Sequence, residues 1–298
     1  MNYKFQILEG PSVRLSDIDI DFIPNVLSKS QWKKIIKKGI VFCNGELADT
    51  SIWVSSKDHI EIKWTLYQDQ LIKPFSLKLE VVYEDDYLAV VNKPPGIPVS
   101  GNVFKSLQNA LSSNLKRSDV MQNGDQFQTC HRLDYSTSGL VVVAKTHFAR
   151  LELGKYFEEK KIRKYYYAIV QGELIQSEGK WVQPIKGKPS SSSYKVLKKV
   201  HSLKNDFLSL LELSPHTGRT HQLRIHCADN NHCIVGDSKY GNPDQMLKGK
   251  GLFLAAYKLQ FIHPVTKQEL DISIDMPNKF DKLLQNEERR YFNYHPKL

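Results

Sequence analysis

The segment HRLDYSTSGLVVVA, residues 131–144, joins a polar loop to an apolar run and is the most informative part of this sequence. The loop ends at Gly139, and the run from Leu140 to Ala144 has the composition of a buried strand. A loop that leads directly into a buried strand can hold one side chain rigidly in a cleft. We therefore interpret Asp134 as a candidate functional carboxylate, with capping of the turn through backbone N–H groups as the alternative.

The composition is that of an ordinary globular protein, with 298 residues, 41% hydrophobic and 25% charged. A chain of this length suggests about two domains. No apolar run approaches the roughly 20 residues needed to span a bilayer. Lys and Arg exceed Asp and Glu by 42 to 32, which gives a net charge of +10. This charge predicts a polyanionic partner, with nucleic acid as the first candidate and an acidic small molecule as the alternative.

The cysteine content predicts a reducing compartment. Four cysteines are too few for a disulfide scaffold in a chain of this length. The N-terminal region also lacks the basic and apolar segments of a secretory leader, and its early acidic residues argue against a mitochondrial one. We therefore expect a cytoplasmic protein that crosses no membrane. The four cysteines are Cys43, Cys130, Cys227 and Cys233.

Residues 12–63 are predicted to form a small N-terminal α/β domain. Ser28 and Gln31 fit a capping box at the start of a helix, and Gly39 fits its end. Asn44-Gly45 after it predicts a type I′ turn between two strands. The polar side of this helix is basic, which favours contact with phosphates over a merely solvated surface. Its lysines are Lys29, Lys33, Lys34, Lys37 and Lys38, and the apolar face carries Trp32, Ile35 and Ile36.

Residues 64–78 are expected to form a linker, and 79–298 a second domain. Strand and helix patterns in this part follow no regular βαβ alternation, so we expect an α+β fold rather than a doubly wound sheet. Strands are predicted at 79–83, 87–91, 139–144, 165–170, 194–200, 207–213 and 270–274, and helices at 104–116 and 148–160.

Two further clusters carry chemistry-bearing side chains. Arg224 follows His221 by three residues, so the two would share one face of a helix, and an arginine there could hold a carboxylate ionised. The alternatives are a phosphate contact or a structural ion pair. In the strand around Tyr166, one tyrosine could stack on a base, with core packing as the alternative. His226-Cys227 and His232-Cys233 lack a second Cys-x-x-Cys pair, so we expect no metal.

These segments together resemble the RluA family of pseudouridine synthases. The match rests on four ordered motifs and runs from about residue 80 to 277. They are His131-Arg132-Leu133-Asp134 with Thr137-Ser138-Gly139; Tyr83-Glu84-Asp85-Asp86 with Asn92-Lys93-Pro94 and Gly96; Lys164-x-Tyr166-x-Ala168 with Gly172; and the run from Thr217 to His226 with Val235-Gly236-Asp237 and Tyr240-Gly241.

The resemblance implies a pseudouridine synthase fold, a mixed and mainly antiparallel sheet with a central RNA-binding cleft. It implies that Asp134 is the essential carboxylate, that Arg224 keeps it ionised and oriented, and that Tyr166 stacks on the uracil. Arg132 matches a position that fills the gap left by a flipped uridine, and Arg219 is expected to contact RNA. The reaction requires no cofactor or energy source, and none is expected here.

The N-terminal domain resembles an S4 domain, a small RNA-binding module often placed before this catalytic domain. The chain departs from the family pattern at Tyr135-Ser136, where a charged pair is common, and at Ala255-Ala256, where His-Ala is common. These departures leave the chemistry in place.

We expect a monomeric enzyme that isomerises uridines in structured RNA, most simply large-subunit ribosomal RNA. The alternatives are the same chemistry on transfer RNA, a non-catalytic ribosome-associated RNA-binding protein, and a carboxylate-based hydrolase such as a nucleosidase. The hydrolase usually requires a second acid or a metal, for which the sequence offers no convincing partner residue.

Overall fold

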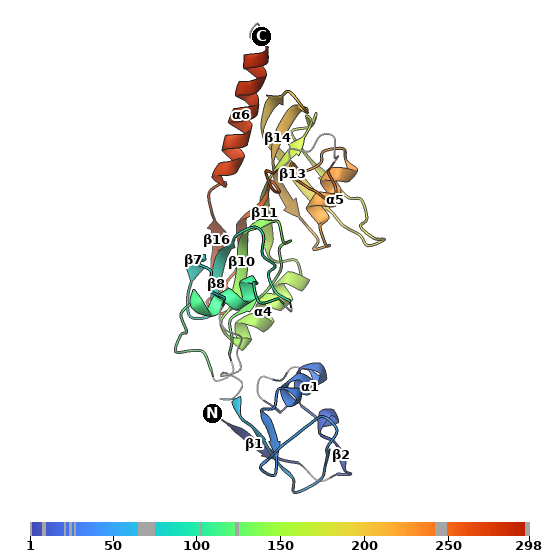
Figure 1. The fold of residues 1–298 in the computed structure, drawn as a ribbon, viewed down its shortest axis with the longest axis vertical. Helices are drawn as coiled ribbons and strands as arrows, with labels where there is room; N and C mark the ends of the chain where they lie inside the picture. Colours follow the sequence, from blue (N-terminus) through green and yellow to red (C-terminus); the bar gives the residue numbers. More distant parts are fainter. Residues whose placement is uncertain are drawn as a thin grey trace. The chain divides into compact units, whose positions relative to one another are not determined.

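The computed structural model describes residues 2–295 except 8–9, 21, 24–25, 27, 65–74, 102, 123–124 and 242–248. The chain separates into two compact units (Figure 1). The first comprises residues 1–74 and 118–126, and the second comprises residues 75–117 and 127–298. Each unit has its own hydrophobic core.

The first unit is a small α/β structure. Its main sheet is antiparallel in the order β1-β6-β3-β4, beside a two-stranded pair of β2 and β5. The helix α1 packs against this framework together with a short 3₁₀ turn. The elements are β1 (Tyr3–Gln6), β2 (Val13–Arg14), η1 (Leu15–Asp17), α1 (Lys29–Lys37), β3 (Val41–Cys43), β4 (Glu46–Leu47), β5 (Trp53–Val54) and β6 (His59–Ile62).

The predicted helix start and stop are confirmed in α1. The Ser28 hydroxyl accepts a hydrogen bond of 3.2 Å from the Gln31 backbone N–H, which satisfies one free donor of the first turn. Gly39 ends the helix with φ of +70°, a left-handed conformation that glycine adopts without strain. The predicted apolar face is buried, and the indole N–H of Trp32 donates to the Leu15 carbonyl at 2.7 Å. The lysines therefore remain on the outer side.

The predicted domain boundaries differ from those of the two compact units. The start at residue 12 left out β1, which pairs with β6 over four residues and completes the sheet. The linker at 64–78 is too long at both ends, because Trp64 belongs to the first core and Leu77 packs against the second. Residues 65–74 of that linker lie outside the described residues.

The second unit is built on one ten-stranded sheet in the order β12-β13-β14-β11-β15-β10-β8-β7, with β9 and β16 at its sides. The pairings are antiparallel except that between β10 and β15, so the expected mixed α+β fold is confirmed. Its strands are β7 (Glu80–Glu84), β8 (Leu88–Lys93), β9 (Gln128–Thr129), β10 (Ser138–Ala144), β11 (Arg163–Gln171), β12 (Glu178–Trp181), β13 (Ser192–Ser202), β14 (Asp206–Pro215), β15 (Leu254–Ile262) and β16 (Glu269–Ser273).

The helices of this unit differ most from expectation. The helix expected at 104–116 is only one short turn of α-helix followed by a 3₁₀ turn, while the polar tail forms a 17-residue helix, α6, that was not predicted. The helical elements are α3 (Leu107–Ala110), η2 (Leu111–Ser113), α4 (His147–Glu158), α5 (Gln222–Asp229) and α6 (Asn278–Tyr294). Among the described residues, no helix combines the length and hydropathy required to traverse a membrane.

The parallel contact between β10 and β15 places the candidate carboxylate. Ser138 pairs with Ala255 and Gly139 with Ala256 at the point where the polar loop enters the sheet. Gly139 has φ of +117°, and a Cβ atom there would lie 2.0 Å from the Ala256 carbonyl oxygen. Only glycine fits such a close approach of two backbones. The loop that carries Asp134 is thereby fixed at the middle of the large sheet.

Candidate active site

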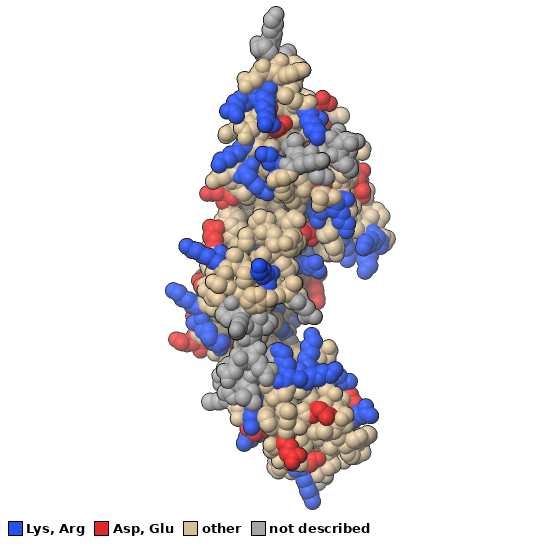
Figure 2. Space-filling view, viewed as in Figure 1, with Lys and Arg blue, Asp and Glu red and all other residues tan. Residues whose placement is uncertain are grey.

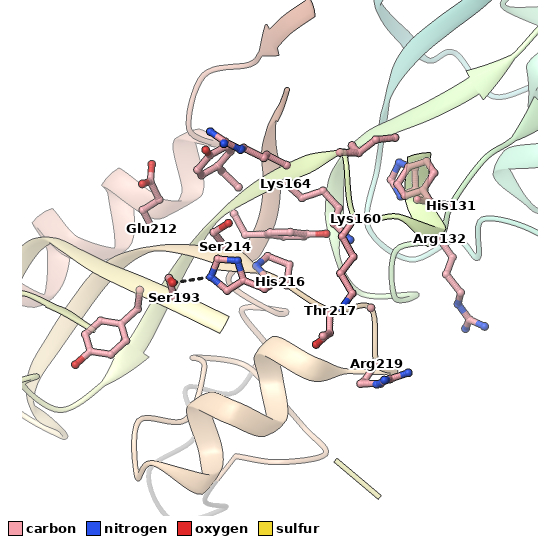
Figure 3. Close-up of a pocket in the computed structure, with 18 of the residues that line it drawn as sticks. His131, Arg132, Lys160, Lys164, Ser193, Glu212, Ser214, His216, Thr217 and Arg219 are labelled. Atoms are coloured by element: carbon pink, nitrogen blue, oxygen red, sulfur yellow. Dashed lines mark hydrogen bonds between the residues drawn. The ribbon is translucent and has the colours of Figure 1, made fainter. Parts of the chain in front are cut away.

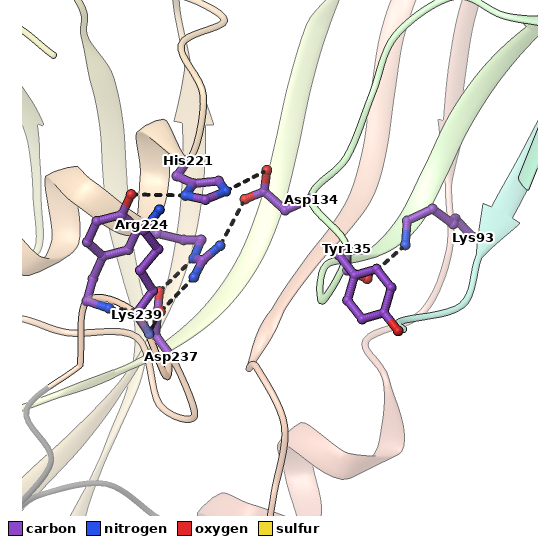
Figure 4. Close-up of polar contacts among 8 residues, drawn as sticks. Lys93, Asp134, Tyr135, His221, Arg224, Asp237 and Lys239 are labelled. Atoms are coloured by element: carbon purple, nitrogen blue, oxygen red, sulfur yellow. Dashed lines mark hydrogen bonds and ion pairs between the residues drawn. The ribbon is translucent and has the colours of Figure 1, made fainter. Parts of the chain in front are cut away.

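The Asp134 loop is held by hydrogen bonds to two of its backbone carbonyls. The Asp134 carbonyl accepts a hydrogen bond from the Thr137 N–H at 3.1 Å, which closes the turn. The next carbonyl, that of Tyr135, accepts from the Gly96 N–H at 2.8 Å and from the Lys93 Nζ at 3.4 Å (Figure 4). The turn is thus attached to the end of β8, so that Asp134 has little freedom of position.

The carboxylate of Asp134 faces an arginine that is itself tightly held (Figure 4). Arg224 donates two hydrogen bonds of 2.7 Å to Asp237, from Nε and Nη2, and its Nη1 lies 3.4 Å from Asp134 Oδ2. Such a bidentate pair fixes the plane of the guanidinium. Arg224 therefore makes a structural ion pair, one of the alternatives considered from sequence, and also reaches the candidate carboxylate.

The electrostatics of this group favour the charged forms. Burial alone would raise the pKa of Asp237, but its hydrogen bonds from Arg224 and from backbone N–H groups hold that pKa below its usual value. Burial alone would lower the pKa of Arg224, and Asp237 and Asp134 outweigh it and raise that pKa. The side chain of Asp134 is 18% exposed, so it is open to a ligand from one side.

His221 approaches the same carboxylate by a different route from the one expected. The helix α5 begins only at Gln222, and His221 precedes it in a left-handed conformation with φ of +56°. The assumption that His221 and Arg224 share a helix face is therefore wrong, yet Nε2 of His221 lies 3.7 Å from Asp134 Oδ1. Its Nδ1 is 3.0 Å from the Tyr240 hydroxyl. Burial lowers the pKa of His221, against the attraction of Asp134.

Lys93 is a fully buried cation on the other side of the loop. Its Nζ donates to the carbonyls of Pro94 and Ile97 at 2.9 Å. Burial lowers the pKa of Lys93 to about 8, and the charge of Asp134 opposes this shift. Its hydrogen bonds tie the β8 end to the Asp134 turn, which indicates a role in holding the loop.

Tyr166 lines the same cavity as Asp134 and is 8% exposed. Burial, followed by the charge of Asp134, raises the pKa of its hydroxyl, so the phenol is neutral. The neighbouring tyrosines are engaged elsewhere, Tyr165 in a hydrogen bond to Gln260 and Tyr167 in a stack on Tyr257 with ring centres 3.8 Å apart. Tyr166 is therefore the residue of this run that meets the candidate site.

The cavity adjoins a larger groove (Figure 3). The cavity at Asp134 has a volume of about 120 Å³, and the groove one of about 1030 Å³. Basic residues outnumber acidic ones along the groove. Two of its lining residues, Ser193 and His216, are joined by a hydrogen bond of 2.7 Å. Its basic residues are Arg132, Lys160, Arg163, Lys164, Lys195 and Arg219, and its acids are Glu158, Glu178 and Glu212.

The structure brings together five residues predicted from sequence. Asp134, Tyr166 and Arg224 line one cavity with Arg132 and Arg219, and the last two also line the groove. Sequence reasoning assigned no role to Asp237 or Lys93, although both lie in the quoted motifs. The sequence feature that could have identified them is a charged residue next to Gly236 in one motif and next to Pro94 in the other.

Four of the five predicted lysines lie on α1 in the first unit, and Lys38 follows its last residue. Figure 2 shows Lys and Arg gathered over this helix. Four of the five border a surface hollow of about 410 Å³, Lys38 being the exception. Lys33 forms an ion pair of 3.3 Å with Asp17, and Lys29 donates to the Asp17 carbonyl. The hollow is accordingly a basic surface with one nearby acid.

The His and Cys residues considered as metal ligands have other contacts. His226 is buried and lies 3.0 to 3.1 Å from the hydroxyls of Ser190 and Ser192 and from the Gln183 carbonyl. Within the described part of the chain, no three His, Cys, Asp or Glu side chains are grouped so as to hold a metal ion.

Comparisons with known proteins agree on one class. The family model described as RNA pseudouridylate synthase matches residues 87–229. A ribosomal large subunit pseudouridine synthase C of Vibrio vulnificus is 31% identical over 92% of this chain and 96% of its own length. An RNA pseudouridine synthase of Aquifex aeolicus is 30% identical over 92% of this chain and 93% of its own.

Solved structures point the same way. Human RNA Pseudouridylate Synthase Domain Containing 1 superimposes with a TM-score of 0.57 and 26% identity, covering 72% of this chain and 96% of that one. The protein is therefore an isomerase that acts on RNA. The chain belongs to the RNA pseudouridine synthases of the RluA type.

Proposed function

We propose that this enzyme converts specific uridines of large-subunit ribosomal RNA to pseudouridine, with Asp134 as the catalytic carboxylate. The observation that carries the proposal is the arrangement of Asp134, Arg224 and Tyr166 around one cavity that opens on a basic groove. Relatives called ribosomal large subunit pseudouridine synthase C and D, the latter from Neisseria meningitidis at 31% identity, support the choice of RNA.

The reaction breaks the N1–C1′ bond of uridine, turns the uracil and joins C5 to C1′. Asp134 either attacks C1′ or removes the C2′ proton to give a glycal, and both routes require the ionised carboxylate. Arg224 supplies the positive charge for this, while Asp237 holds the guanidinium in place. The contact of Arg224 with Asp134 is the longer one, 3.4 Å against 2.7 Å, so the Asp134 oxygens keep lone pairs for the sugar.

Tyr166 is proposed to stack on the uracil while the base is detached. Its ring lies in the cavity, and burial keeps its hydroxyl protonated. In the variant Tyr166→Phe, we expect RNA binding within about threefold of the wild type, because the ring face is retained. Binding constants and single-turnover rates measured together test this. Preserved binding with a collapsed rate would show that stacking alone is an inadequate account and that the hydroxyl takes part in proton transfer.

The groove is proposed to hold the RNA on one side of the target. A glycosidic bond is inaccessible in a stacked helix, so the uridine must be flipped out, at lowest cost from a loop or bulge. Arg132, exposed at the mouth shared by cavity and groove, is placed to fill the space it leaves. Arg219, which lines the same cavity and groove, would then contact phosphate.

The first unit is proposed to be an S4-like RNA-binding domain that acts through α1. Replacing Lys33, Lys34, Lys37 and Lys38 by Gln preserves helix propensity and the apolar face, so the fold should remain. If each lysine meets a phosphate, the slope of log affinity against log salt should flatten by roughly 3. Turnover on saturating RNA should persist because the chemistry lies in the second unit.

A control for this experiment is the pair Lys4→Gln and Lys57→Gln, exposed lysines of the same unit that do not border the hollow. The control should leave the slope near that of the wild type. A slope unchanged in the four-lysine variant would reduce α1 to a solvated helix and remove the proposed role of this unit.

The function itself is tested by incubating unmodified large-subunit ribosomal RNA with the protein and mapping pseudouridine, with transfer RNA in parallel. Pseudouridine at defined ribosomal positions is expected. Modification of transfer RNA alone would transfer the proposal to that substrate. Unchanged uridine would indicate a binding protein, and released uracil a hydrolase. We further propose a monomer that acts in the cytoplasm, consistent with the low cysteine content of the sequence.

A further inference from the structure

Tyr135 is an exposed aromatic residue directly after Asp134. Its side chain is 61% exposed, whereas Leu133 before Asp134 is buried. Single exposed apolar residues are common on protein surfaces, so exposure alone carries no conclusion. The second observation is that the backbone of Tyr135 is anchored. Its carbonyl accepts hydrogen bonds from the Gly96 N–H at 2.8 Å and from buried Lys93 Nζ at 3.4 Å.

The ring lies on the far side of the loop from the cavity. In Figure 4 the Asp134 carboxylate points toward Arg224 and His221, and the Tyr135 ring projects the other way. Tyr135 accordingly lines neither the cavity nor the groove. Consecutive Cα atoms are about 3.8 Å apart. The ring therefore lies outside the cavity that Tyr166 lines, on the residue directly after Asp134.

Flipping a base out of a stack removes stacking contacts that an aromatic ring such as that of Tyr135 can replace. When one base leaves a stack, each of its two neighbours loses a stacking partner. Arg132 lines the cavity, and Tyr135 lies outside it. Tyr135 presents a neutral aromatic surface on the other side, and such surfaces accept any base because every base has a π face.

We propose that Tyr135 stacks on the nucleobase adjacent to the flipped uridine, on the side opposite the groove. The proposal rests on the proposed function, since it assumes an RNA strand that passes over the Asp134 loop. It assigns a substrate contact to a residue at which this chain departs from the charged pair of the family pattern. A stacking contact with a base is insensitive to salt, whereas the contact of a basic side chain with a phosphate weakens as the salt concentration rises.

The test uses the full chain and unmodified large-subunit ribosomal RNA transcribed in vitro. Tyr135→Ala should bind this RNA about tenfold more weakly, as expected when one base loses an aromatic partner, and the loss should fall on KM rather than kcat. The salt slope should equal that of the wild type. Tyr135→Phe keeps the ring and should restore binding, whereas Tyr135→Leu keeps apolar area without the π face and should not.

The matched control is Tyr294→Ala, which removes another exposed tyrosine, 73% exposed, from α6 of the same unit. It should bind as the wild type does. Equal affinity of Tyr135→Ala and the wild type would overturn the inference, and so would a flattened salt slope or failure of Tyr135→Phe to restore binding. Because binding is measured separately from pseudouridine formation, a wild type that binds without forming product would contradict the proposed function and leave this readout intact.

Discussion

The Asp134→Asn variant is expected to lose turnover completely while it continues to bind RNA. Asparagine keeps the shape of the side chain and its place beside Arg224, but it can neither attack C1′ nor accept the C2′ proton. Affinity should therefore remain within about 1 kcal/mol of the wild type, so that the loss appears in kcat alone. Single-turnover assays at saturating enzyme measure this directly.

The control is Asp281→Asn, which removes an exposed carboxylate from the first turn of α6, far along the chain from the site. It should retain full turnover. Appreciable pseudouridine from purified Asp134→Asn protein would remove Asp134 from the reaction under both chemical routes.

Arg224→Ala is expected to lower the rate by about two decades or more, because a preorganised charge beside the reacting carboxylate is lost. It should also destabilise the fold, since Asp237, with a side chain 1% exposed, would be left as an unpaired buried charge. Removing one partner of a buried pair typically costs roughly 3 to 5 kcal/mol. Thermal unfolding of the variant must therefore be measured as well. The rate must be measured at a temperature where the variant is folded.

Arg224→Lys separates the two effects. Lysine keeps the positive charge but cannot form the two parallel bonds to Asp237 while reaching Asp134. We expect intermediate stability together with a large rate loss, which would show that orientation and charge both count. A folded Arg224→Ala protein that turns over like the wild type would exclude any catalytic role for this arginine.

The sequence predicts the bounds of a helix correctly where those bounds depend on neighbouring residues. The cap at Ser28 and the stop at Gly39 depend only on residues within one turn, and α1 follows both. The C-terminal segment gave no helix prediction, because it is mostly polar and only a few of its apolar residues are buried. Phe280 and Leu284 are buried in the core of the second unit, and this burial turns a weakly patterned segment into α6.

The site required contacts that no local pattern specifies. The pairing of Arg224 with Asp237 depends on the turn between them, and its approach to Asp134 joins segments 90 residues apart. Helical spacing suggested the partnership of His221 and Arg224 for the wrong reason, because α5 starts one residue later than that argument needs. The resemblance of the motifs to a known family identified Asp134 and Arg224 as site residues, whereas local sequence patterns could not predict that they lie close together.

The parallel pairing of β10 with β15 also has a consequence for how the protein is made. Asp134 is positioned by a strand whose neighbour, β15, begins only at Leu254, so the ribosome must release most of the chain before the centre of the sheet can close. Long-range and parallel pairings of this kind form slowly. A nascent or truncated chain ending before Leu254 would expose the edge of β10, a site for wrong pairing, and would leave the reactive loop attached to the end of β8 alone. Activity thus emerges only near the end of synthesis.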